Sequence, residues 1–195
     1  MKKDILREFF SIPNLLGYLR IALIPLYLYI YLNARELRDY YYAAGVMALS
    51  FLSDLFDGKI ARRFNMVTEF GKLLDPVADK LTQAALAVSF AFRFPIMRLL
   101  FAALVIKDGT LLILGIYFFR HGMKVLKNGA QMHGKVCTFV MDISMLLILF
   151  MPGTAYGVVI ALTALSLLFM GYSFYRYLME YAGAFEELKK KKKEI

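Results

Sequence analysis

Four aspartates in a strongly apolar part of the chain are the residues best suited to do chemistry. They are Asp54, Asp57, Asp75 and Asp79. Four like charges at close range repel each other strongly where the dielectric is low, and a bound cation relieves that repulsion. Carboxylate oxygens are hard ligands that suit Mg²⁺, Mn²⁺ or Ca²⁺ better than softer metals. The group therefore predicts a divalent-metal site.

The spacing of these aspartates places them in pairs on helix faces. Asp54 and Asp57 are three residues apart, and Asp75 and Asp79 are four apart, so each pair shares one face of a helix. A rise of 1.5 Å per residue puts all four at a similar depth near one membrane surface. We therefore predict two helices, joined by a short loop, that present their carboxylates to each other.

A simpler interpretation is that these are helix-end carboxylates, solvated or paired with cations close in the sequence. Those cations are Arg62, Arg63, Lys72 and Lys80. This interpretation suits any single aspartate better than four together, because an ionisable residue within a span is costly and marks function by default.

Small residues lie between the two pairs. Gly58 and Ala61 follow Asp57 on the same expected helix and would leave room for a flat ligand, although close helix packing also uses small residues. Gly71 has the same two interpretations and a third as a loop residue. Arg62 would suit a diphosphate through paired N–H donors, or would serve only as a cation near the membrane surface.

The elements that must position these residues are membrane spans. The chain of 195 residues is 60% hydrophobic with a mean hydropathy of +0.58, beyond what an ordinary soluble domain hides. Six segments are apolar and long enough, at about 14–33, 39–62, 71–92, 96–119, 133–151 and 155–178. We predict an all-α membrane domain over 13–180, preceded by an amphipathic interfacial segment over 1–12 and followed by a basic tail over 181–195.

The basic residues predict the orientation. With the N-terminus in the cytoplasm, most Lys and Arg residues of the loops are cytoplasmic and only Arg35, Arg38, Arg93 and Arg98 lie outside. Both termini are then cytoplasmic, in a cell membrane. The net charge of +9 therefore reflects topology and contact with anionic lipid, and no nucleic-acid partner is expected. A single cysteine, Cys137, excludes an intrachain disulfide and a cysteine-rich metal site.

Taken together, the chemical residues resemble the signature of the CDP-alcohol phosphotransferase family, DxxDGxxAR, eight residues, then GxxxDxxxD. Every fixed position is filled, by Asp54, Asp57, Gly58, Ala61, Arg62, Gly71, Asp75 and Asp79. The start of the first span, with Pro13, Asn14, Arg20 and Pro25, is similar to that family as well.

The resemblance implies a homodimeric six-helix enzyme that transfers a phosphatidyl group from CDP-diacylglycerol to an alcohol and releases CMP. It implies that the four aspartates hold two divalent cations, Mg²⁺ or Mn²⁺, in a site that faces the cytoplasm. Asp79 would also be the general base. Asp57, Gly58, Ala61, Arg62 and Gly71 would form the nucleotide site.

The acceptor is expected to be glycerol 3-phosphate, which needs cations to bind its phosphate. The candidates are Lys107, Arg120 and Lys135, although Lys107 would also pair with the adjacent Asp108. Family members that make phosphatidylglycerophosphate usually carry Arg-Glu where this chain has Lys107-Asp108. Cardiolipin synthases, which use phosphatidylglycerol, often carry Arg-Asp there and are the leading alternative, with inositol phosphate another possible acceptor.

A divalent-cation transporter is the alternative outside enzymology, because intramembrane aspartates also mark ion pathways. Transporters place their sites near the midplane between repeated halves. The clustering of these aspartates toward one surface, and the lack of a sequence repeat, favour the enzyme.

Overall fold

The computed structural model describes residues 9–64, 66, 68–122 and 131–191, and this part of the chain is built from six α-helices without strands. They are α2 (Ile12–Leu32), α3 (Leu37–Arg63), α4 (Glu69–Arg93), α5 (Met97–Arg120), α6 (Met132–Phe150) and α7 (Tyr156–Lys191). The prediction of six helical segments is confirmed, with five of the six agreeing to within a few residues at both ends. Most of the expected interfacial segment at 1–12 lies outside the described residues.

Four of these helices are long and apolar enough to cross a membrane, namely α2, α5, α6 and most of α7. The chain is therefore a multi-pass membrane protein. The remaining two, α3 and α4, carry the four aspartates together with several Lys and Arg residues. Their length of 27 and 25 residues still suits a span. The four aspartates are among the charges that lower the apolar character of these two helices.

The last helix is longer than the sequence predicts. The expected span ends at about 178, whereas α7 continues to Lys191. Residues 179–191 contain no proline and are rich in Glu, Ala and Lys, which favour helix. In this extension Tyr181 and Ala184 pack against Phe118 of α5, so the start of the predicted tail is a structured helix.

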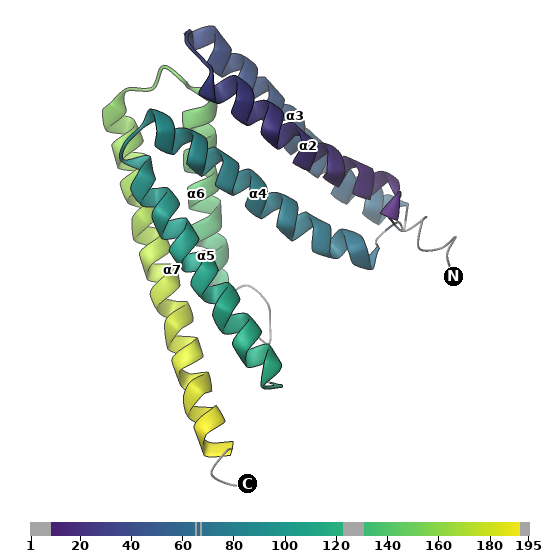
Figure 1. Cartoon of the computed structure of the whole chain (residues 1–195), viewed down its shortest axis with the longest axis vertical. Helices are drawn as coiled ribbons and strands as arrows, with labels where there is room; N and C mark the ends of the chain where they lie inside the picture. Colours follow the sequence, from purple (N-terminus) through teal and green to yellow (C-terminus); the bar gives the residue numbers. More distant parts are fainter. Residues whose placement is uncertain (1–8, 65, 67, 123–130, 192–195) are drawn as a thin grey trace. The chain divides into compact units, whose positions relative to one another are not determined.

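The chain separates into two compact units. The first contains residues up to Arg93 together with Ile148–Gly153, and the second contains Phe94–Leu147 with the chain from Thr154 onward. In the first unit, α2 packs along both α3 and α4, and α2 and α3 run side by side in Figure 1. In the second unit, α5 packs along α7.

Two glycines allow α2 and α4 to approach closely. A Cβ at Gly17 would lie 2.8 Å from Leu74 Cδ2, and one at Gly71 would lie 2.7 Å from Asn14 Oδ1. Such distances are too short for ordinary contacts, so a larger residue at either position would push the two helices apart or displace a side chain. The close approach of α2 brings its side chains next to the aspartates of α3 and α4.

Candidate active site

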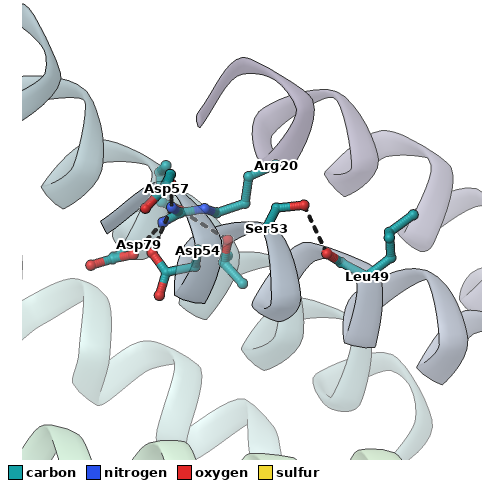
Figure 2. A network of polar contacts seen from close by, with 8 residues as sticks. Arg20, Leu49, Ser53, Asp54, Asp57 and Asp79 are labelled. Atoms are coloured by element: carbon teal, nitrogen blue, oxygen red, sulfur yellow. Dashed lines mark hydrogen bonds and ion pairs between the residues drawn. The ribbon is translucent and has the colours of Figure 1, made fainter. Parts of the chain in front are cut away.

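Arg20 of α2 is the centre of the site, as Figure 2 shows. Its Nη2 lies 2.5 Å from Asp54 Oδ1 and 2.5 Å from Asp57 Oδ2, and its Nη1 lies 2.7 Å from Asp79 Oδ1. Two of these carboxylates come from α3 and the third from α4. One guanidinium from α2 therefore connects carboxylates on both of the helices that flank it.

The cluster is buried on one side and open on the other. The side chains of Arg20 and Asp57 are 2% and 6% exposed, whereas those of Asp54 and Asp79 are 45% and 60% exposed. Asp75 is also exposed and interacts electrostatically with Arg20 and Asp54. A ligand can therefore reach Asp54, Asp75 and Asp79 from outside, while Arg20 and Asp57 form the floor of the site.

This arrangement differs from the prediction that the carboxylates of α3 and α4 face each other directly. The sequence predicted two helices presenting carboxylates to each other, but α2 supplies the cation that lies between them. Sequence reasoning named Arg20 only as part of the family-like start of the first span and gave it no place in the site. The signal was present, because an arginine within an apolar 21-residue helix is as costly as an aspartate there.

Two of the nearby cations proposed as partners have contacts within α4. Lys72 Nζ lies 2.6 Å from Glu69 Oε1, and Lys80 Nζ donates a 3.4 Å hydrogen bond to Gln83 Oε1. Arg63 is exposed at the end of α3, and the side chain of Arg62 lies outside the described part of the chain. Asp54, Asp57 and Asp79 each contact Arg20 of α2.

The start of α4 is fixed to α2 by a hydrogen-bonded cap. Thr68 Oγ1 accepts a 2.9 Å hydrogen bond from the backbone N–H of Gly71, as a helix-capping side chain does. Asn14 Nδ2 donates a 3.1 Å hydrogen bond to the same Thr68 oxygen, and Asn14 is buried. The absence of a side chain at Gly71 leaves room for Asn14. This cap sets the position of α4 one turn before Asp75.

The other predicted nucleotide residues lie near the end of α3. Gly58, Ala61 and Arg62 belong to its last two turns, directly after Asp57. Ala61 is partly buried, and the burial of Gly58 and the side chain of Arg62 lie outside the described part of the chain. Their role in binding a nucleotide stays a prediction.

The three predicted acceptor residues belong to the second unit. Lys107 of α5 is buried, and its Nζ lies 3.5 Å from Asp108 Oδ1, the local pair that the sequence also allowed. Arg120 ends α5 and Lys135 lies in the first turn of α6, and both are exposed. Their contact with an acceptor stays a prediction.

The donor set of the cluster suits a hard divalent cation by its chemistry. Four carboxylates supply only oxygen, and three of them already converge on a positive group. In the arrangement around Arg20, no three acidic, histidine or cysteine side chains of the described residues are grouped as ligands of one ion. A cation at these oxygens would therefore take the place of guanidinium contacts.

Known proteins resemble this chain along most of its length. A family model described as CDP-alcohol phosphatidyltransferase matches residues 10–171, which includes the whole carboxylate cluster. A cardiolipin synthase (CMP-forming) of Streptomyces coelicolor is 32% identical over 148 residues, which is 75% of this chain and 68% of that relative.

Two further relatives carry a different name, CDP-diacylglycerol–glycerol-3-phosphate 3-phosphatidyltransferase. The one from Aquifex aeolicus is 32% identical over 140 residues, 70% of this chain and 74% of the relative. The one from Rickettsia bellii is 47% identical, but over 72 residues that cover 36% of this chain and 39% of the relative. The aspartate pattern, the six helices that carry it and the extent of these matches agree, and the chain belongs to the CDP-alcohol phosphatidyltransferase family.

Proposed function

We propose that this protein transfers the phosphatidyl group of CDP-diacylglycerol to glycerol 3-phosphate, giving phosphatidylglycerophosphate and CMP. The observation that carries the proposal is the convergence of Asp54, Asp57 and Asp79 from two helices on one point, in a chain whose family has this type of reaction. A structural membrane protein has no reason to keep four costly carboxylates together.

The aspartates have two proposed roles. Asp54, Asp57, Asp75 and Asp79 are the ligands of Mg²⁺ or Mn²⁺, with two ions in each site. Bound there, the ions would stabilise negative charge on the attacking and leaving oxygens of the phosphoryl group. The exposure of Asp54 and Asp79 supports this assignment, because ligands that take up ions and substrate must be reachable.

Asp79 is also the proposed general base. It accepts the proton of the acceptor hydroxyl as that oxygen forms a bond to the phosphorus atom that bears diacylglycerol. The bond between this phosphorus and the bridging oxygen of CMP breaks, and CMP leaves with the bonding electrons. A positioned base contributes about 10²–10⁴-fold to such a step. Asp79 is the most exposed of the three carboxylates that contact Arg20, which suits contact with an entering hydroxyl.

The proposed nucleotide site consists of Asp57, Gly58, Ala61, Arg62 and Gly71. The first four lie close together near the end of α3, and Gly71 lies at the start of α4. Arg62 would donate paired N–H groups to the diphosphate, a geometry that a lysine lacks. Gly71 would act indirectly, by leaving space for the Asn14 side chain that holds the cap of α4.

Glycerol 3-phosphate is proposed as the acceptor, with its phosphate bound by Lys107, Arg120 and Lys135. The similarity to the Aquifex aeolicus relative over 70% of this chain supports this choice. The similarity to the Streptomyces coelicolor relative supports the second candidate, phosphatidylglycerol, which would make the product cardiolipin. Inositol phosphate is a third candidate acceptor.

We further propose a homodimer in the cytoplasmic membrane, with both termini and the active site on the cytoplasmic side. The distribution of Lys and Arg among the loops supports this orientation. It gives a lipid donor access from the bilayer and a soluble acceptor access from the cytoplasm.

The test uses the purified protein in lipid with CDP-diacylglycerol and Mg²⁺ or Mn²⁺. CMP release is followed with glycerol 3-phosphate, phosphatidylglycerol, inositol phosphate, inositol or serine added singly, and the lipid product is identified by mass spectrometry. We expect release with glycerol 3-phosphate and its loss in excess chelator. Release only with phosphatidylglycerol would show that this lipid, and not glycerol 3-phosphate, is the acceptor. If folded protein releases no CMP with any acceptor, CDP-diacylglycerol is excluded as the donor. Metal uptake into sealed vesicles would then favour a transporter.

A further inference from the structure

Arg20 shares its contacts among more carboxylates than one guanidinium can neutralise. Asp54, Asp57 and Asp79 each contact it, and Asp75 interacts with it electrostatically. Four carboxylates against one arginine leave three negative charges in the cluster when all are ionised. An arginine that is 2% exposed needs such partners, because an unpaired buried charge is strongly unfavourable.

The oxygens that Arg20 occupies are those that a divalent cation would use. Its Nη2 contacts Asp54 Oδ1 and Asp57 Oδ2, and its Nη1 contacts Asp79 Oδ1. A guanidinium and a metal ion cannot both lie within contact distance of the same three oxygens from the same side. The Nε of Arg20 is also buried and makes no hydrogen bond within the described part of the chain. One of the donor groups of this side chain is therefore without a partner there.

We propose that Arg20 is a built-in counter-ion that competes with the divalent cation for the aspartate oxygens, and that it thereby sets the metal affinity of the site. Binding of the cation displaces the guanidinium from Asp54, Asp57 and Asp79. In its absence, Arg20 keeps α3 and α4 drawn toward α2. This inference rests on the proposed metal role of the aspartates.

The competition predicts an unusual direction of effect. Removing a residue of a binding site normally weakens binding. Replacing Arg20 by an uncharged residue is instead expected to strengthen the binding of Mn²⁺ by about 10-fold or more, which corresponds to about 1.4 kcal/mol. The same variant is expected to be less thermally stable in chelator than the parent protein. It is also expected to gain more stability from added Mn²⁺, since the metal then replaces the positive charge that Arg20 supplied to the cluster.

The experiment measures free Mn²⁺ by electron paramagnetic resonance during titration of the parent protein, Arg20→Gln, Arg20→Lys and Arg38→Gln in lipid nanodiscs. Arg38→Gln is the matched charge control, because Arg38 is exposed and pairs with Glu36 at the start of α3. We expect tighter binding in Arg20→Gln, an intermediate value in Arg20→Lys and no change in Arg38→Gln. Equal or weaker binding in Arg20→Gln would overturn the inference and leave the proposed function intact. The absence of saturable binding in the parent protein would count against the metal role itself.

A measurement on the unaltered side chain covers the case in which Arg20→Gln does not fold, and separates direct exchange from a general change in charge. The protein is labelled with ¹⁵N-arginine, and the guanidinium signals are followed during titration with diamagnetic Mg²⁺. The Arg20 signal is assigned by its loss in Arg20→Lys. We expect this signal to shift in proportion to bound metal. A signal that stays constant while Mg²⁺ binds would overturn the inference.

Discussion

The first unit holds α2, α3 and α4 together in two chemically opposite ways. At one end, which we name the carboxylate end, Arg20 joins Asp54, Asp57 and Asp79. Further along the same helices lies an aromatic end, formed by Tyr27, Tyr31, Tyr40 and Phe90. Its rings are mostly buried, and contacts between these rings hold the three helices together there.

The aromatic end has the features of a structural contact. The ring of Tyr31 lies 5.1 Å from that of Tyr40 and 5.7 Å from that of Phe90, both near edge-to-face. Tyr27 and Ser89 share a 2.6 Å hydrogen bond, so the buried hydroxyl is satisfied. Arg93 lies 3.9 Å from the Tyr40 ring centre and donates a 2.6 Å hydrogen bond to Pro152 O. These polar groups are therefore paired, whereas the buried Tyr31 hydroxyl makes no hydrogen bond within the described residues.

The carboxylate end has the opposite balance. It contains more negative than positive charge and exposes Asp54 and Asp79, although burying apolar groups there would stabilise the contact more simply. Active sites commonly keep such unfavourable arrangements at the expense of stability. The comparison teaches that the aromatic end supports the fold, and that the carboxylate end is available for chemistry.

Removal of metal should give the largest effect and should act only through the carboxylate end. We expect excess chelator to lower the rate of CMP release by on the order of 10³-fold, because metal stabilisation of phosphoryl-transfer charge amounts to several kcal/mol. Added Mg²⁺ or Mn²⁺ should restore the rate. The control is chelator already saturated with metal. Full activity in chelator alone would show that the cluster works without ions.

Truncation of a side chain at the aromatic end should lower the stability of the protein and leave its catalytic rate unchanged. Phe90 is fully buried, so Phe90→Ala is expected to lower the free energy of unfolding by about 3 kcal/mol. The remaining folded protein should keep its rate per molecule and its response to metal. Phe92→Ala is the matched control, because Phe92 is on the same helix and exposed. Unfolding is measured by thermal denaturation in detergent. Lost activity at unchanged stability would break the comparison.

A substitution at Gly71 should affect the connection between α4 and α2. The new Cβ would lie 2.7 Å from Asn14 Oδ1, so Gly71→Ala is expected to lower the free energy of unfolding by about 1–2 kcal/mol. Asn14→Ala removes the obstructing oxygen, so the double variant should lose less than the sum of the single variants. Gly45→Ala is the control, because a Cβ there meets nothing within 4 Å. Strictly additive losses would exclude this contact as the cause.

The smallest effect is expected from Tyr27→Phe. It removes the hydroxyl that bonds to Ser89 but keeps the ring, so we expect a loss of about 1 kcal/mol. Ser89 stays satisfied because its hydroxyl also donates to Leu86 O at 2.9 Å. Metal binding, measured by Mn²⁺ titration, should not change. A changed metal affinity would show that the two ends are coupled.

Sequence reasoning found the parts of the fold that depend on local runs of residues. Each span was recognised by a run of about 20 mostly apolar residues. The aspartates within α3 and α4 were too few to hide that run. The predicted sixth span ends at about 178, and α7 continues beyond it because hydropathy falls there while helix propensity does not. The helix continues through Tyr181 and Ala184, which pack on Phe118, a contact that depends on the fold.

The site was predicted to the extent that it is local in sequence. The spacing of the aspartates marked them as one group, but nothing near them in sequence pointed to Arg20, which is 59 residues from Asp79. Asn14 and Thr68 are 54 residues apart and show the same difficulty. Both contacts depend on α2 packing along α4, which periodicity does not reveal. The sequence singled out Arg20 by its place in an apolar span and in the family-like start of that span, but its partners required the structure.

The most direct test of the central claim is the rate of CMP release by Asp79→Asn with CDP-diacylglycerol, glycerol 3-phosphate and Mg²⁺. Asparagine keeps the size of the side chain and can still accept from Arg20, and it removes one of the repelling charges, so the melting temperature should not fall appreciably. We predict a rate lower by about 10²–10⁴-fold in protein that is folded like its parent. A folded Asp79→Asn variant that releases CMP at the parental rate would contradict the assignment of this cluster as the active site.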